Sequence, residues 1–168
     1  DVALTDTTAA DLLAWRDRPP IIIDESEGEL HALERALESG YAGTSHKNCK
    51  GIFRGVANAC VIAQRRRAEP ARALHLSGED LTNLGPVALL QDLAVAATLG
   101  IAHVERNGHH YFRGLSEFPA PVQRGILAHH ADLYREHRGY PVVRIERGKV
   151  STRSVVAAPF GYAMSEVV

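Results

Sequence analysis

Residues 20–26 read PIIIDES, an apolar run that ends on charged residues. Three consecutive isoleucines form a wholly apolar, β-branched run, which is typical of a strand buried on both faces. The run stops on two adjacent carboxylates, Asp24 and Glu25. Asp and Ser also favour helix N-caps, so the acidic end is either an ordinary turn or a site. The folds of α/β proteins place their ligands at the carboxyl ends of strands. The residues at the ends of the other predicted strands therefore distinguish a turn from a site.

Strand-like segments recur along the chain, each followed by apolar residues at helical spacing. The predicted strands are 21–24, 41–45, 72–76 and 101–104. Their starts lie roughly 20 to 30 residues apart, the size of βα units in a parallel sheet. The sequence therefore predicts an α/β fold with four βα units.

Apolar positions at helical spacing predict the helices between these strands. They are Leu30, Leu33 and Leu37; Ile52, Val56, Ala59 and Ala63; and Val87, Leu90, Ala94 and Ala97. Gly40 and Gly100 are expected to end the first and third of these helices. Further helices are predicted at 7–16 and near 121–130. Residues 141–150 predict a terminal hairpin or an extended arm, so we place a boundary near Gly139, between a domain at 1–138 and an arm at 139–168.

The composition is that of a globular protein, with 45% hydrophobic and 23% charged residues among 168. A net charge of −1 provides no global field for nucleic acid or an anionic membrane. Cys49 and Cys60 form no CxxC pair, which indicates a reducing, cytoplasmic setting. No segment has transmembrane length, and no signal peptide opens the chain. The first residue is Asp1 rather than Met, so we expect a piece of a longer protein.

Every predicted strand runs into ionisable residues at the same end. The four clusters are Asp24-Glu25-Ser26; Ser45-His46-Lys47-Asn48, with Lys50 close behind; Ser77-Gly78-Glu79-Asp80; and Glu105-Arg106-Asn107. In a parallel sheet these ends gather on one rim. Caps and turns explain small polar residues there, but they do not explain Lys47, Glu79 and Glu105. The pattern favours a site over a set of turns.

Such a rim suits a particular chemistry. Clustered carboxylates repel one another unless a hard cation lies between them, and Mg²⁺ accepts oxygen ligands of this kind. A lysine near that cation is expected to have a lowered pKa, in the range of a general base. Carboxylates, a divalent ion and a lysine base fit proton abstraction beside a substrate carboxylate, with the metal neutralising the enediolate.

The segments IIIDES, GTSHKNCKG and SGEDLTNLGPVALLQDLAVAATLG resemble the carboxyl-terminal half of an enolase-superfamily barrel. The resemblance spans about 20–112 and is nearest to the mandelate racemase and muconate lactonizing enzyme branch. It implies the second half of a TIM (β/α)₈ barrel with a C-terminal extended arm. A full barrel takes about 250 residues, so we expect a fragment that is inactive alone, with exposed sheet edges that favour self-association.

The resemblance also implies roles for individual residues. Asp24 would bind Mg²⁺, Lys47 would be the acid/base residue, and Glu25 would be its partner. Glu79 would be a hydrogen-bonding acid and Glu105 would lie near the substrate. Two further positions stay open: Lys50 is either a substrate contact or a solvated helix residue, and His109 is either a loop contact to substrate or simply exposed.

The implied enzyme is a lyase or isomerase: an acid-sugar dehydratase, a racemase or a cycloisomerase. Its substrate would be a small carboxylate or acid sugar, and the full-length protein would be a homo-oligomer. Two alternatives stay open. One is a class I aldolase-like barrel in which Lys47 forms a Schiff base. The other is a non-catalytic α/β ligand-binding domain whose rim acids are only caps.

Overall fold

The structure, a computed structural model, describes residues 6–79 and 82–162. The chain is a mixed α/β protein with a small parallel sheet. It divides into two compact units, Asp1–Glu79 and Asp80–Val168, and each is described by itself. The finer prediction, four βα units of a half-barrel, stays a proposal.

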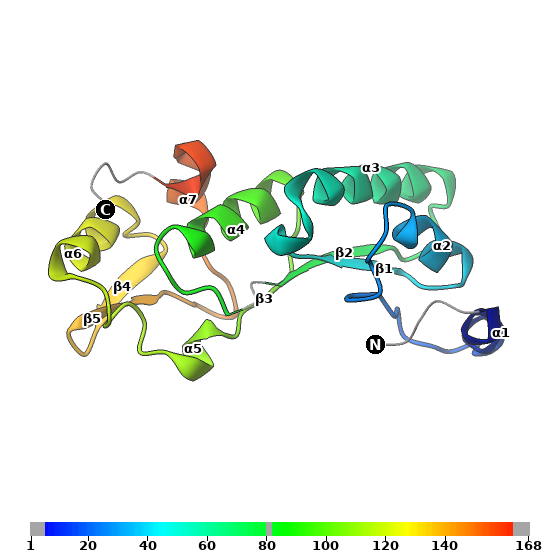
Figure 1. The fold of residues 1–168 in the computed structure, drawn as a ribbon, viewed down its shortest axis with the longest axis horizontal. Coiled ribbons are helices and arrows are strands. Elements are labelled where there is room, and N and C mark those ends of the chain that lie inside the picture. The colour runs from blue at the N-terminus through cyan, green and yellow to red at the C-terminus, as the bar shows by residue number, and fades with distance from the viewer. Residues whose placement is uncertain (1–5, 80–81, 163–168) are drawn as a thin grey trace. The chain divides into compact units, whose positions relative to one another are not determined.

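Unit 1 is built around two parallel strands, β1 (Gly43–His46) and β2 (His75–Glu79), shown in Figure 1. Their register runs from Gly43 opposite His75 to His46 opposite Gly78. The helices are α1 (Asp6–Ala14), α2 (Ala32–Glu38), the 3₁₀ turn η1 (Asn48–Lys50) and α3 (Ile52–Ala68). The helix α2 packs on β1, and α3 packs on β2.

The PIIIDES stretch runs parallel to β1, as an isolated bridge between Ile23 and Thr44 rather than a full strand. Three backbone hydrogen bonds hold it there. They are Ala42 N to Ile21 O at 2.7 Å, Ile23 N to Gly43 O at 3.0 Å, and Ser45 N to Ile23 O at 3.0 Å. Asp24 therefore leaves the sheet at the same end as Lys47, which follows β1.

Glycine ends two helices as the sequence predicts. After α2, Gly40 has φ +95°, Gly40 N bonds Leu37 O, and Tyr41 N bonds Ala36 O at 2.9 Å. After α4 (Ala88–Thr98), Gly100 has φ +68° and the same two bonds recur, with Ile101 N on Ala96 O at 2.9 Å. This is the Schellman arrangement, which satisfies the last carbonyls of a helix.

The helix α3 is confirmed, but its predicted buried face is wrong. Ile52 and Val56 are each 42% exposed, whereas Gly55, Asn58 and Ile62 are buried. Ile62 joins a core cluster with Leu33, Leu37 and Leu74. The apolar pattern misleads because this helix turns the polar Asn58 inward, toward a buried carboxylate of the same unit.

Unit 2 combines short helices with an antiparallel hairpin. Besides α4, its elements are β3 (Val104–Glu105), α5 (Gly108–Tyr111), α6 (Ala120–His129), β4 (Tyr134–His137), β5 (Tyr140–Val143), α7 (Arg153–Ala157) and η2 (Pro159–Gly161). Its core contains Leu89, Leu90, Leu93, Leu115, Ile126, Leu133, Tyr134 and Val155.

The hairpin of β4 and β5 lies on both sides of the predicted boundary near Gly139. Arg138 and Gly139 form its two-residue turn, and both have positive φ, as a type I′ turn requires. The helix α6 packs on both strands. Residues before and after position 139 therefore belong to one sheet. The hairpin therefore spans 134–143 rather than 141–150, where an isolated antiparallel bridge joins Glu146 and Lys149.

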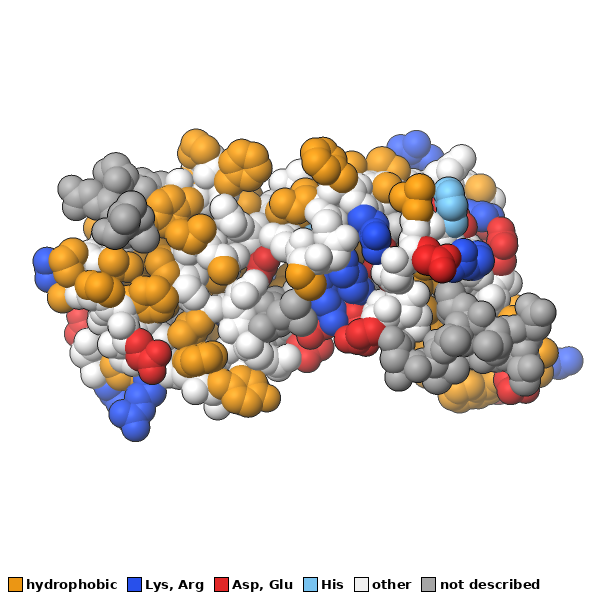
Figure 2. Space-filling model, in the orientation of Figure 1, with side chains coloured by type: hydrophobic (Ala, Val, Ile, Leu, Met, Phe, Trp, Pro, Cys, Tyr) orange, Lys and Arg blue, Asp and Glu red, His pale blue; other side chains and the backbone are white. Residues whose placement is uncertain are grey.

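The surface of the described residues combines charged and apolar side chains (Figure 2). Among the described residues, no helix is both long enough and apolar enough to cross a bilayer. Acidic and basic side chains are interspersed with apolar ones on the face drawn in Figure 2. Several large apolar side chains are exposed, among them Phe53 at 90% and Phe160 at 78%.

Candidate functional site

The site in unit 1 is centred on the buried side chain of Lys47, which is only 6% exposed. Lys47 follows β1 and has an extended backbone, so it continues the strand. Side chains alternate along a strand, so Lys47 and Ser45 lie on the same face. The register of β1 and β2 places Lys47 next to Glu79, one step beyond the pair His46 and Gly78.

Three carboxylates surround the ammonium group of Lys47. Its Nζ lies 2.9 Å from Asp24 Oδ2, 3.0 Å from Glu25 Oε1 and 2.8 Å from Glu79 Oε2. The three acids differ in exposure: the Glu25 side chain is 64% exposed, Asp24 33% and Glu79 21%. Lys47 is therefore a buried cation whose most exposed partner is Glu25.

Lys50 approaches the same site from η1. Its Nζ donates to Asp24 Oδ1 at 2.9 Å, to the Asp24 carbonyl at 2.8 Å and to the Ser45 carbonyl at 3.2 Å. The Ser45 hydroxyl also donates to Asp24 Oδ1. Each lysine thus contacts a different carboxylate oxygen of Asp24.

A further acid, Glu27, is buried and anchors the acidic loop to the rest of unit 1. Its side chain is 2% exposed and lies 3.5 Å from Lys50 Nζ. It accepts hydrogen bonds from the Thr44 hydroxyl at 3.0 Å and from the Asn58 amide. Arg54 donates to the Glu27 carbonyl at 3.1 Å. These contacts fix the loop that presents Asp24 and Glu25 to Lys47.

The electrostatics of the site follow from these contacts. Burial by itself would lower the pKa of Lys47, but hydrogen bonds to Glu79, Asp24 and Glu25 and the charge of Asp24 raise it above its ordinary range. Burial would raise the pKa of Asp24, but hydrogen bonds from Ser45, Lys47 and Lys50 hold it well below its usual range. The predicted lowering of the Lys47 pKa is wrong, because it assumed a metal cation beside the lysine. The structure instead surrounds Lys47 with carboxylates, and these raise its pKa.

The donor set does not fit Mg²⁺ as it is arranged. Both oxygens of Asp24 accept hydrogen bonds from lysines, and the Lys47 ammonium occupies the position between Asp24, Glu25 and Glu79 that a cation would take. In the part of the chain that the structure describes, no group of three or more His, Cys, Asp and Glu side chains could hold a metal ion. Mg²⁺ at Asp24 stays a prediction of the resemblance, and we assign no step to it.

The structure brings together five of the predicted site residues: Asp24, Glu25, Lys47, Lys50 and Glu79. Two others belong to unit 2. Glu105 accepts a hydrogen bond from Asn107 at 2.7 Å, and the exposed His109 lines a cavity in that unit. Asp80, which the sequence grouped with Glu79, lies outside the described residues.

Sequence reasoning missed Glu27 and Asn58 as parts of the site. Glu27 stands in the same acidic run as Glu25, which was a usable signal. Asn58 had no such signal, because a polar residue in a helix ordinarily faces solvent.

Comparison with known proteins yields no match: no protein-family model, no curated protein and no solved structure is similar to this chain.

Proposed function

We propose that the full gene product moves a proton at the carbon next to a carboxylate of a small acid or acid sugar, and that Lys47 carries this proton. One observation supports the proposal above all. A buried lysine contacts Asp24, Glu25 and Glu79, and all four residues follow or end parallel strand segments of one unit. Buried ionisable groups with specific charge partners concentrate at functional sites.

The ammonium form of Lys47 is the resting state, because its pKa is raised. In the protonation direction, an N–H bond of Lys47 breaks and a C–H bond forms at the α carbon of an enediolate. This leaves a neutral amine, which takes a proton from solvent through Glu25, whose Oε1 lies 3.0 Å away. In the reverse direction Lys47 first releases one proton to solvent through Glu25, and the neutral amine then abstracts the α proton, so that an N–H bond forms as the C–H bond breaks. Asp24 and Glu79 hold the nitrogen in place in both directions.

The finer fold is part of the same proposal. The order of segment 21–23, α2, β1, α3 and β2 repeats strand and helix, and neighbouring strands are parallel. We propose that these elements belong to the second half of a (β/α)₈ barrel of the enolase superfamily. Barrels of this kind carry their reacting groups at the carboxyl ends of the strands, where Asp24, Lys47 and Glu79 stand.

A Schiff-base mechanism at Lys47 is the alternative at the same site. Attack on a carbonyl and abstraction of an α proton both need the neutral amine, so the raised Lys47 pKa does not separate them, whereas protonation of an enediolate uses the ammonium that the three carboxylates favour. Borohydride treatment in the presence of a carbonyl substrate would label Lys47 in the aldolase alternative and leave it unlabelled in ours.

The proposal is tested by proton exchange in D₂O. The full gene product is incubated with a panel of α-hydroxy acids and acid sugars, with and without added Mg²⁺, and loss of the α-proton signal is followed by NMR. We expect exchange with at least one acid, and a drop of about 10² to 10⁴ in Lys47→Met, the range of general acid–base catalysis. Lys149→Met, which changes an exposed lysine of unit 2, should exchange at the unaltered rate. Exchange that survives in folded Lys47→Met, or no exchange with any acid, would refute the proposal.

A further inference from the structure

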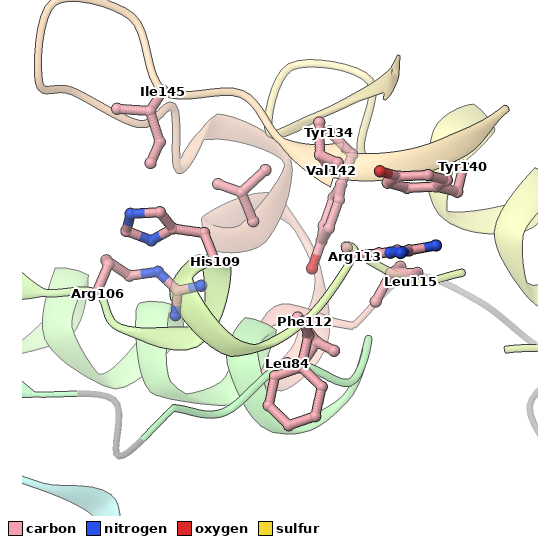
Figure 3. Close-up of a pocket in the computed structure, with 12 residues that line it drawn as sticks. Leu84, Arg106, His109, Phe112, Arg113, Leu115, Tyr134, Tyr140, Val142 and Ile145 are labelled. Carbon is pink, nitrogen blue, oxygen red and sulfur yellow. The ribbon is translucent and has the colours of Figure 1, made fainter. Parts of the chain in front are cut away.

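Unit 2 contains a cavity that sequence reasoning did not identify. It has a volume of about 210 Å³ and lies between the loop 106–115 and the hairpin of β4 and β5 (Figure 3). The described residues that line it include no acid. Its volume is below the ~300–1,000 Å³ of sites for drug-sized ligands, so it suits a small molecule.

The lining combines basic and phenolic groups with an apolar wall. Arg106, His109 and Arg113 come from the loop, and Tyr134 and Tyr140 come from the hairpin. The apolar part of the wall is made by Leu84, Phe112, Leu115, Val142, Val143 and Ile145. A ligand that fits both parts has an anionic group and an apolar body.

The hydroxyl of Tyr134 points to a missing hydrogen-bond partner. The residue is 2% exposed, and among the described residues no partner lies within hydrogen-bond distance of its oxygen. Figure 3 shows the Tyr134 ring extending from β4 into the cavity. A buried phenol without a partner destabilises the folded protein, because its hydroxyl has lost the hydrogen bonds that water would make with it. Acceptance of this hydrogen bond by a ligand would remove that cost.

The charge around Tyr134 indicates the kind of acceptor. Burial raises the pKa of Tyr134 and nearby Arg106 opposes this, so the phenol is a neutral donor beside a cation. Planar guanidinium groups match carboxylates, and a monoanion is less costly to desolvate in an apolar cavity than a phosphate dianion. The loop itself is fixed to the hairpin, because Leu115 N donates to Pro141 O at 2.9 Å.

We propose that this cavity binds a small carboxylate with an aromatic or branched apolar body, held by the Tyr134 hydroxyl and the guanidinium groups of Arg106 and Arg113. Every residue of the cavity lies in unit 2, and none belongs to the Lys47 cluster, so the inference stands apart from the proposed function.

The test is a binding titration of the full gene product with benzoate, followed by NMR or calorimetry. The same titration is carried out with three further ligands: cyclohexanecarboxylate, the neutral benzyl alcohol and inorganic phosphate. We expect both carboxylates to bind, and both phosphate and benzyl alcohol to bind at least 10-fold more weakly than benzoate. Phosphate or benzyl alcohol binding as tightly as benzoate, or no binding of either carboxylate, would overturn the proposal.

Two variants separate the site from nonspecific binding. Tyr134→Phe removes only the hydroxyl, which has no partner, so the protein should remain folded while benzoate affinity falls about 10-fold or more. Tyr162→Phe is the matched control, since its hydroxyl is also buried without a partner among the described residues, and Tyr162 does not line the cavity. Equal benzoate affinity in Tyr134→Phe and wild type would overturn the proposal. Loss of α-proton exchange in Lys47→Met is a separate readout, so the two proposals can fail independently.

Discussion

The ammonium nitrogen of Lys47, directly after β1, lies 2.8 Å from Glu79 Oε2 at the end of β2. The parallel register produces this contact, because it pairs His46 with Gly78 and so places the following residues side by side. Asp24 joins them from the neighbouring parallel segment. A buried lysine at the end of β1 is thereby enclosed by acids from the two neighbouring strand ends.

Removing the Lys47 charge should destabilise the fold. Lys47→Met removes the cation between Asp24 and Glu79 and leaves Asp24 with Lys50 alone. Loss of one partner of a buried pair costs about 3–5 kcal/mol. We expect the lower end, about 3 kcal/mol, because Glu25 is largely exposed and screened by solvent. Urea unfolding followed by the fluorescence of Trp15, the single tryptophan, measures the change. Lys149→Met is the control, and an equal effect of both variants would contradict the prediction.

Asn58 should stabilise the fold through its hydrogen bond to Glu27. Asn58→Asp places a second carboxylate against the buried Glu27 and removes the amide donor, so we expect unfolding to become easier by about 2 kcal/mol or more at neutral pH. Gln64→Glu makes the same amide-to-acid change on an exposed part of α3 and should have little effect. If acidification fails to restore stability to Asn58→Asp, repulsion between the two acids is not the cause.

Gly43 should tolerate no side chain. Its φ is +147°, and a Cβ there would lie 1.8 Å from the carbonyl oxygen of His75, so the parallel pair of β1 and β2 would have to separate. We expect Gly43→Ala to destabilise unit 1 by several kcal/mol, on the order of the largest single-residue effects. Gly28→Ala, at a position with nothing within 4 Å, is the control. Equal melting temperatures of the two variants would show that β1 and β2 are not packed this closely.

Acid stability of unit 2 should depend on Asp132. Burial would raise the pKa of Asp132, but hydrogen bonds from Ser151 and Ser154 lower it from the ordinary value of 3.8 to about 2. A lowered carboxyl pKa stabilises the fold above 3.8, and this contribution is lost as the pH falls from 3.8 toward 2. Asp132→Asn should therefore remove part of the stability difference between pH 5 and pH 2, measured by circular dichroism during urea unfolding. An unchanged difference would contradict the assignment.

Local signals in the sequence predicted the features that depend on local geometry. Gly40 and Gly100 end their helices because only glycine adopts positive φ there without strain. The meeting of Asp24, Lys47 and Glu79 followed from the strand-helix repeat, since parallel strands share one carboxyl end. This part of the candidate site needed no knowledge of side-chain packing.

Features that depend on contacts distant in sequence were missed. The buried face of α3 is set by the bond from Asn58 to Glu27, and apolar periodicity contains no trace of it. The start of the hairpin was missed because Arg138, rather than a second glycine, adopts positive φ in its turn. The cavity around Tyr134 joins a loop and a hairpin whose side chains have no shared pattern in the sequence.

The most direct test is an NMR titration of Lys47 in protein labelled with ¹³C at lysine Cε. The chain has only three lysines, so Lys47→Arg and Lys149→Arg assign the signals. The account predicts that Lys47 titrates above its ordinary value of 10.5, and that Glu79→Gln lowers its pKa. The charged form then stabilises the fold below pH 10.5, and this contribution is lost as the pH rises further. A Lys47 pKa at or below 10.5, unaffected by Glu79→Gln, would contradict the central claim that three carboxylates hold this lysine as the proton carrier.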